Sequence, residues 1–229
     1  IVENIANIAG LYSALIERHG ISAHRLIFGA GFGIPYHDND SPIDLDEIAK
    51  ATVPIFEELA ISSLVDGGEI SLEMGRFLMG ECGVFLAQVL NKKTTRGTEI
   101  LVIDGGMNHF LGASGNLGSV LKRNYPVHNL SRPADGELVE YDIAGPLCTN
   151  IDTLGRGVRL PPTERGDLIA VGCGGAYGLT ASPVYFISHR LPKEIVAESR
   201  DDGFEFLDVS DSGVPRTPPD WDTDWTRTG

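Results

Sequence analysis

The sequence is poor in three features, and each shortage excludes a class of protein. No apolar run approaches the roughly 20 residues of a membrane-spanning helix, so no membrane partner is expected. Only 3 of the 229 residues are cysteines, none with the spacing of a zinc site, which favours a reduced, cytoplasmic protein. Lysine and arginine together number 18 against 32 acidic residues, a formal charge of −14. This charge argues against nucleic acid as a partner, because binding its phosphates requires clustered cations.

The first third of the chain shows an alternation of helix and strand patterns. Apolar residues recur at helical spacing over 1–19. A short apolar run at 26–28 then predicts a buried strand, which ends in a glycine-rich turn at 29–33. A second helix is expected to begin at Asp44, and a second strand covers 69–72. This order predicts parallel strands joined by helical crossovers.

Two parallel strands with their helices cannot bury both faces of a sheet. Residues 1–83 are therefore expected to be the last part of a (β/α) barrel whose other strands lie outside this chain. Ile1 is not a natural start residue, so we expect the chain to have been processed, truncated or cut from a longer protein.

After about Gly83 the pattern changes to short strand-like runs separated by Gly, Pro, Asn and Asp. The predicted strands cover 84–90, 99–103, 138–143, 167–171 and 184–187. We therefore expect a mainly antiparallel β domain over residues 84–200. The remainder, 201–229, is acidic and proline-rich with little periodicity, which predicts a loosely held tail.

Two segments at strand ends are candidate ligand-binding residues. Glycines at 29–33 let backbone N–H groups approach a phosphate, although a tight turn that needs positive φ is the simpler explanation. Glu73 and Arg76 follow the next strand, at the rim where barrel enzymes keep their sites. The guanidinium fork of Arg76 matches phosphate oxygens, but an acid and an arginine three residues apart also commonly form an exposed ion pair.

The β half carries two further candidates. Cys148 lies in a Gly-Pro loop, where it is either a small buried residue or an exposed thiol that donates a proton. Tyr177 stands among glycines, either as a packing residue or with its hydroxyl on a ligand. His37, Asp38 and Asp40 share one polar loop without the geometry of a metal site, so no metal is expected.

The order of these motifs is more specific than any one of them. Along the chain it runs Gly29-Ala30-Gly31-Phe32-Gly33, Glu73-Met74-Gly75-Arg76, Asp104-Gly105-Gly106-Met107, Gly145-Pro146-Leu147-Cys148 and Gly175-Ala176-Tyr177-Gly178. This series resembles that of the fold-type III diaminopimelate/ornithine decarboxylase family, over residues 1 to about 190. The resemblance implies an α/β plus β fold: the C-terminal part of an alanine-racemase-like (β/α)8 barrel, then a mainly antiparallel β-barrel or sandwich domain.

The resemblance also implies a cofactor, pyridoxal 5'-phosphate (PLP), and a role for each motif. The phosphate is expected on the backbone of residues 29–33, with Gly75, Arg76 and the Tyr177 hydroxyl close by. Glu73 is expected to face the pyridine nitrogen and keep it protonated, so that the ring accepts electrons when CO₂ leaves.

Cys148 is the implied proton donor to the α-carbon of the substrate, with Asp152 in the same catalytic region. In the family this loop comes from the partner subunit, so the resemblance implies a homodimer with shared active sites.

Two parts of the family pattern have no counterpart here. The lysines match nothing like the Val-Lys-Ala-Asn motif that carries the Schiff-base lysine, and a His-x-Gly-Ser motif is also missing. The chain alone is therefore expected to be inactive. Thr149 stands where ornithine- and diaminopimelate-type enzymes have an acid that binds the distal amine of the substrate.

With Gly-Ile-Pro-Tyr at 33–36, Thr149 makes the chain resemble the branch found in secondary-metabolite and exopolysaccharide gene clusters. One member of that branch acts on a glutamyl group held by an acyl carrier protein.

Three functions are weighed on these residues. The first is PLP-dependent decarboxylation of a small amino acid, either diaminopimelate/ornithine-like or a carrier-bound glutamyl-type substrate. The alternative is a non-catalytic homologue that acts as a binding or regulatory protein, although Glu73, Arg76, Cys148 and Tyr177 are all retained. A racemase fits less well, because such enzymes use a tyrosine of the second subunit in place of a Cys-x-x-x-Asp loop.

Overall fold

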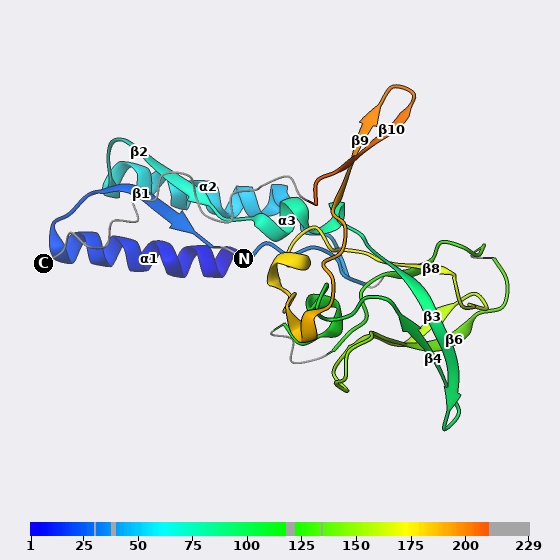
Figure 1. Ribbon diagram of the computed structural model, residues 1–229. Coiled ribbons are helices and arrows are strands. Elements are labelled where there is room, and N and C mark those ends of the chain that lie inside the picture. Colours follow the sequence, from blue (N-terminus) through cyan, green and yellow to red (C-terminus); the bar gives the residue numbers. More distant parts are fainter. Residues whose placement is uncertain (30, 38–39, 118–121, 134, 211–229) are drawn as a thin grey trace, which may run out of the picture. The chain divides into compact units, whose positions relative to one another are not determined.

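The structure of the chain is a computed structural model that describes residues 1–210, except 30, 38–39, 118–121 and 134 (Figure 1). Ala30 of the glycine-rich turn and Asp38 of the polar loop therefore lie outside the described residues, as does the end of the predicted tail. The chain divides into two compact units, Ile1–Ile187 and Ser188–Gly229, and each is described by itself.

The first unit opens with two helix–strand pairs, as the sequence predicts. They are α1 (Val2–His19), β1 (Ala23–Phe28), α2 (Leu45–Ser63) and β2 (Leu64–Leu72). Helix α1 ends where Gly20 takes the left-handed conformation at φ 59°, and Asp44 caps α2 by accepting the Glu47 N–H at 3.0 Å. Strands β1 and β2 pair in parallel, so Phe28 lies opposite Leu72. No helix in the described part of the chain is long and apolar enough to cross a membrane.

One apolar cluster holds these four elements together. Its buried members are Ile5, Ala9, Leu26, Phe28, Phe32 and Leu59. The rings of Tyr12 and Phe56 contact Phe28 edge-on at 5.4 and 5.2 Å, which adds aromatic packing to the burial. Ile27 and Leu72 of the same two strands stay 43% and 40% exposed. The described residues therefore cover only part of this small parallel sheet.

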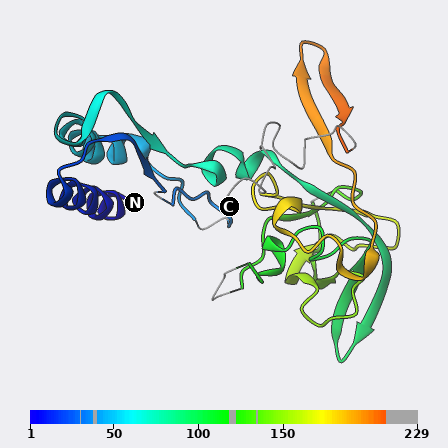
Figure 2. The ribbon, with the colours of Figure 1, turned by 60° about the vertical axis from the view of Figure 1, so that its left-hand side comes forward.

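A short helix, α3 (Gly75–Met79), and a 3-10 turn (Gly80–Cys82) lead into a six-stranded sheet. Its strands are β3 (Phe85–Thr95), β4 (Thr98–Ile103), β5 (Val127–Asn129), β6 (Val139–Ala144), β7 (Thr153–Leu160) and β8 (Leu168–Val171). Their order is β5-β8-β3-β4-β6-β7, and every neighbouring pair is antiparallel except β4–β6. The mainly antiparallel domain is thus confirmed. The β3–β4 hairpin extends beyond the rest of the sheet, as Figures 1 and 2 both show.

The prediction of a strand at 184–187 is wrong, because this segment forms a 3-10 turn (Phe186–Ser188). Ile187 and Ser188 have φ values of 45° and 60°, which no β-strand accommodates.

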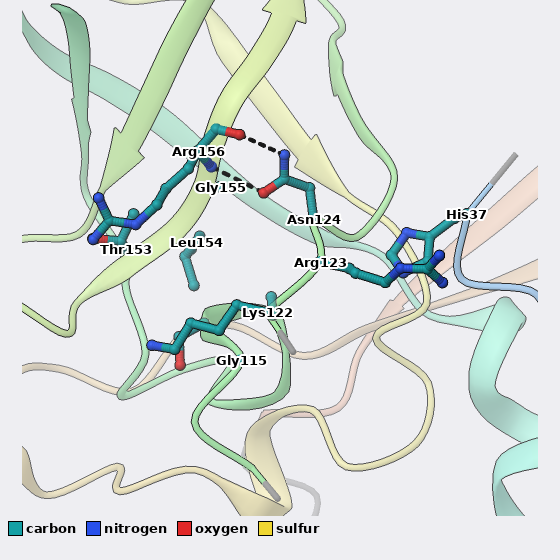
Figure 3. Close-up of a pocket in the computed structure, with 11 residues that line it drawn as sticks. His37, Gly115, Lys122, Arg123, Asn124, Thr153, Leu154, Gly155 and Arg156 are labelled. Atoms are coloured by element: carbon teal, nitrogen blue, oxygen red, sulfur yellow. Dashed lines mark hydrogen bonds between the residues drawn. The ribbon is translucent and has the colours of Figure 1, made fainter. Parts of the chain in front are cut away.

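The sheet curls until its two edge strands, β5 and β7, approach one another. The side-chain amide of Asn124 bridges this seam, since it donates to the Arg156 carbonyl at 2.7 Å and accepts the Arg156 N–H at 2.9 Å (Figure 3). An amide that bonds this way replaces one step of a strand ladder. The interior is filled by apolar side chains that include Leu101, Tyr141 and Ile143, all at most 1% exposed.

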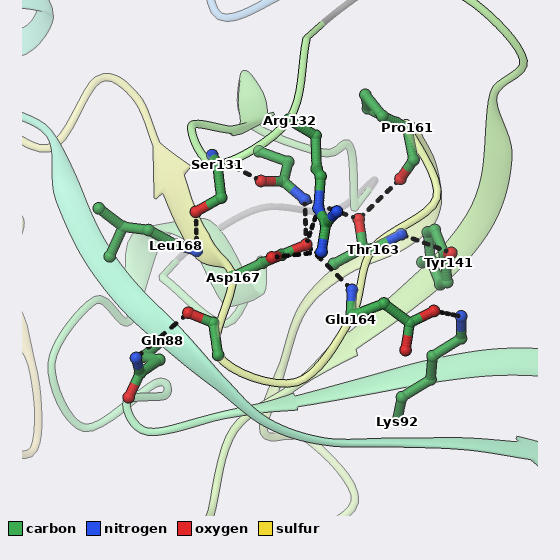
Figure 4. Close-up of polar contacts among 12 residues, drawn as sticks. Gln88, Lys92, Ser131, Arg132, Tyr141, Pro161, Thr163, Glu164, Asp167 and Leu168 are labelled. Carbon is green, nitrogen blue, oxygen red and sulfur yellow. Dashed lines mark hydrogen bonds and ion pairs between the residues drawn. The ribbon is translucent and has the colours of Figure 1, made fainter.

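A buried polar network around Asp167 ties β8 to the loop after β5 (Figure 4). The carboxylate accepts two bonds from Arg132 at 2.9 and 3.0 Å, one from Asn129 at 3.1 Å and one from the Glu164 N–H at 3.0 Å. Burial alone would raise the pKa of Asp167, but these bonds and the Arg132 charge outweigh it, so the pKa lies below its ordinary value. Asp167 therefore stabilises the folded sheet as an anion.

The second unit contains a two-stranded hairpin, β9 (Ile195–Arg200) and β10 (Gly203–Asp208). The prediction of an irregular tail from 201 is therefore wrong up to residue 208. The alternation of Phe204 and Phe206 with acidic residues is a strand pattern, and Arg200 pairs with Glu205 across the strands at 2.7 Å. Residues 211–229 lie outside the described part.

Candidate functional site

A pocket lies where β1 and β2 end. Because the two strands are parallel, the turn after β1 and the turn after β2 leave the sheet at the same edge. The Glu73 N–H donates to the Phe28 carbonyl at 2.9 Å, which fixes one turn against the other. The pocket has a volume of about 330 Å³, and its lining residues are Gly29, Gly31, Phe32, Glu73, Met74, Gly75, Arg76 and Tyr177. Seven of these eight carry roles in the site expected from the sequence.

The glycine-rich turn leaves its backbone open to the pocket. Gly31 has a φ of 67°, in the left-handed region that favours glycine. A Cβ built on Gly31, Gly33 or Gly75 would meet no atom within 4 Å, so a bound group has room to approach these positions. Phe32 fixes the turn to the core, because the residue is 94% buried and its ring centre lies 6.1 Å from that of Phe77.

Arg76 is held by aromatic rings and not by a carboxylate. Its guanidinium carbon lies 4.9 Å from the Tyr177 ring centre and 5.9 Å from that of Tyr36. Within the described residues, neither Arg76 nor Glu73 forms an ion pair, with each other or with a third group. The exposed ion pair that the sequence left open is therefore not formed. The pocket thus contains an available cation and an available anion.

Tyr177 reaches the pocket from the loop after β8. This loop is bonded to the 3-10 turn that follows α3: the Gly174 N–H donates to the Gly83 carbonyl at 2.8 Å and the Gly175 N–H to the Gly80 carbonyl at 3.1 Å. A Cβ on Gly175 would overlap the Met79 carbonyl oxygen, which explains why glycine is required there. Tyr177 itself has a φ of 57° and is about half exposed.

Tyr36 is a pocket neighbour to which the sequence assigned no role. Its ring contacts Tyr125, with 4.6 Å between the ring centres, and the Arg76 guanidinium lies over it at 5.9 Å. Burial, reinforced by Tyr36, raises the pKa of Tyr125 well above its ordinary value, so the Tyr125 hydroxyl stays neutral. The position of Tyr36, three residues after the glycine turn, was the signal that could have identified it.

Asp40 of the predicted polar loop contacts Tyr36, the neighbour of the pocket. Asp40 accepts the Tyr36 N–H at 3.1 Å and pairs with Arg123 at 3.2 Å. Its carboxylate therefore links the Tyr36 backbone to Arg123.

Cys148 and Asp152 do not line this pocket. Cys148 is exposed. Asp152, in contrast, is 3% exposed, and its carboxylate accepts the Met107 N–H at 2.7 Å and the Leu147 N–H at 2.8 Å.

Asp152 thus joins two loops, because β4 and β6 are parallel neighbours and the loops after them leave the same edge. A Cβ on Gly106 or Gly145 would overlap the carboxylate, so both glycines provide the space for it. The residue that Asp152 fixes, Leu147, directly precedes Cys148.

Comparison with known proteins gives a consistent result. Residues 11–175 match the family model described as "Pyridoxal-dependent decarboxylase, C-terminal sheet domain". The L-glutamyl-[BtrI acyl-carrier protein] decarboxylase of Niallia circulans is 34% identical over 210 residues, covering 90% of this chain and 48% of that protein. The diaminopimelate decarboxylase of Bacillus subtilis is 31% identical over 172 residues, 75% of this chain and 37% of that protein.

Solved structures agree in fold. The diaminopimelate decarboxylase from M. jannaschii in complex with L-lysine has a TM-score of 0.72 at 23% identity, covering 95% of this chain and 48% of that one. A further diaminopimelate decarboxylase structure has a TM-score of 0.75 at 21% identity, covering 90% of this chain and 50% of that one. The chain therefore spans about half the length of the relatives that it matches.

Proposed function

The chain belongs to the pyridoxal-dependent decarboxylase family, and we propose that its pocket holds PLP in an amino-acid decarboxylase. The observation that carries this proposal is the convergence of four groups at one edge of the β1–β2 sheet. They are an open glycine turn, a carboxylate and a guanidinium that form no ion pair among the described residues, and a tyrosine from the β half. A phosphorylated, cationic ring needs partners of these kinds, and the residues present fit the cofactor.

The phosphate end would lie on the turn after β1. A Cβ built on Gly31 or Gly33 would meet no atom within 4 Å, so a phosphate has room to approach this backbone, and Arg76 supplies a charge that no described carboxylate neutralises. The ring of Tyr177 lies beside the guanidinium, which leaves its hydroxyl as a further hydrogen-bonding group.

The ring end would lie by Glu73. A Cβ on Gly29 would stand 3.8 Å from Glu73 Oε2, so the carboxylate faces the same turn as the phosphate site. An ionised carboxylate there keeps a pyridine nitrogen protonated. PLP, when bound, supplies the electron sink for loss of CO₂, and Glu73 is the residue of this chain that maintains it.

We propose that the remaining parts of the active site lie outside these 229 residues. The partly uncovered β1–β2 sheet and the half-length match to relatives support a longer protein that contains the lysine of the family. Cys148, exposed and away from the pocket, would serve the site of a second subunit in a homodimer. This chain alone would then be inactive.

The substrate that we propose is a glutamyl group on a carrier protein. Thr149 follows Cys148 and carries no charge for a distal amine, which disfavours ornithine and diaminopimelate. The relative that acts on a glutamyl-carrier substrate is 34% identical over nine-tenths of the chain.

The test is titration of the full-length protein with PLP, followed by absorbance. Arg76→Ala removes a charged hydrogen-bonding partner worth about 1.5–3 kcal/mol, so the Kd for PLP should rise roughly 10- to 100-fold. Arg159→Ala, an exposed arginine outside the pocket, should leave the Kd unchanged. Equal affinity in all three proteins would refute the proposal. CO₂ release from glutamyl-carrier protein, compared with free diaminopimelate and ornithine, then tests the substrate.

A further inference from the structure

A second pocket in the first unit is lined by cations. It has a volume of about 430 Å³ and lies between the turn at 113–115, the segment 122–124 and the strand segment 153–156 (Figure 3). Lys122, Arg123 and Arg156 all line it, in a chain whose formal charge is −14. A local concentration of positive charge on an acidic protein favours an anionic ligand.

Two of the three cations lack a close carboxylate partner. Lys122 Nζ donates to the neutral Asn116 Oδ1 at 2.9 Å, and Arg156 forms only a long, partly exposed ion pair with Asp142, at 3.8 Å. Arg123, in contrast, pairs with Asp40 at 3.2 Å. Figure 3 shows Lys122 and Arg156 extending to the same side, while Arg123 turns toward His37.

Lys122 and Arg156 are both placed by neighbouring residues. Gly115 is left-handed at φ 69°, and a Cβ there would come within 2.8 Å of Lys122 Cγ, so the lysine stem lies across the glycine turn. The Arg156 backbone is bonded on both sides by the Asn124 amide. Such fixed placement reduces the ordering cost of binding.

This cationic pocket is linked to the PLP pocket by one pair of rings. Tyr36, which faces Arg76, directly precedes His37, and Tyr125, which contacts Tyr36, directly follows Asn124. His37 and Asn124 both line the cationic pocket. The two pockets are therefore neighbours on either side of the Tyr36–Tyr125 pair.

We propose that the cationic pocket binds a phosphate group in the arm that carries the substrate. This inference rests on the proposed function, and it adds a second site that recognises the carrier arm. Carrier proteins hold acyl groups as thioesters of a phosphopantetheine arm, whose phosphate lies far from the thioester. That anion is of the class that Lys122 and Arg156 would bind.

Two probes that differ only in the phosphate test this site in the full-length, PLP-loaded enzyme. They are glutamyl-S-phosphopantetheine and glutamyl-S-pantetheine. With about threefold from each exposed cation, the wild type should prefer the phosphorylated probe roughly tenfold in kcat/KM at low salt. The Lys122→Ala/Arg156→Ala double variant should lose this preference while its kcat/KM for the other probe stays unchanged. The matched pair Lys93→Ala/Arg159→Ala, exposed cations outside the pocket, should retain it.

Calorimetric binding of phosphopantetheine alone separates this inference from the proposed function. Binding by the wild type that the double variant loses supports the cationic pocket, even where no glutamyl probe is decarboxylated and the proposed function fails. Equal kcat/KM for both probes in the wild type would overturn the inference, as would an equal loss for both probes in the double variant.

Discussion

Replacing Asp152 with Asn tests how the Cys148 loop is held. The carboxylate accepts the Met107 and Leu147 N–H groups at 2.7 and 2.8 Å and is 97% buried. Asn keeps one acceptor but turns an NH₂ group toward the other N–H, which leaves that donor unpaired. A hydrogen bond to a charged group contributes about 1.5–3 kcal/mol, and a buried unpaired donor costs about 1–3 kcal/mol. We therefore expect a local destabilisation of about 2–4 kcal/mol.

Hydrogen exchange in the full-length protein measures this effect at the two amides. In Asp152→Asn, exchange of the Met107 or Leu147 N–H should accelerate roughly 30- to 1000-fold, the factor that corresponds to about 2–4 kcal/mol. Alkylation of Cys148 should also accelerate, because its loop opens more often. The control is Asp142→Asn, a partly exposed carboxylate in β6, the strand that precedes the loop. Unchanged exchange at both amides in Asp152→Asn would refute the argument.

Two further predictions concern the sheet and the Tyr177 loop. Because the pKa of Asp167 is lowered on folding, its contribution is present above the unfolded pKa of about 4 and is lost as the pH falls through the lower folded value. Thermal unfolding of the full-length protein should thus show a loss of Tm at acid pH that Asp167→Asn reduces; identical pH profiles would contradict it. Gly175→Ala should cost about 1–3 kcal/mol by overlap with the Met79 carbonyl and should weaken PLP binding, whereas Gly10→Ala, on an exposed helix face, should not destabilise the protein. Denaturant unfolding that gives both variants the wild-type midpoint would contradict this reading.

The sequence predicted the elements whose signals are local. Helix α1 and the cap of α2 follow from apolar spacing and from Asp44, and both are confirmed. Strand β7 was missed because Gly155 and Gly157 interrupt its apolar alternation. The parallel pairing of β4 with β6 also could not be predicted, because it depends on contacts between segments about 40 residues apart. The role of Asn124 between the edge strands was also not predictable, because it depends on bonds to Arg156, 32 residues further along the chain.

Most of the candidate site was predicted from the order of its motifs, and the structure brings Gly29, Glu73, Arg76 and Tyr177 to one pocket. The partners of these residues were not predictable, because they depend on tertiary packing. The contact of Tyr36 with Tyr125 joins positions 89 residues apart in the sequence. The carboxylate of Asp152 accepts a bond from Met107, which lies 45 residues earlier. The buried carboxylate of Asp152 holds the Cys148 loop through Met107 and Leu147, and its catalytic role stays a prediction.

The most direct test of the central claim is an electron-density map of the full-length protein crystallised with PLP. We expect the phosphate within hydrogen-bonding distance of the backbone at 31–33 and of Arg76, and the pyridine nitrogen beside the Glu73 carboxylate. A phosphate bound elsewhere, or a pyridine nitrogen away from Glu73, would contradict the account.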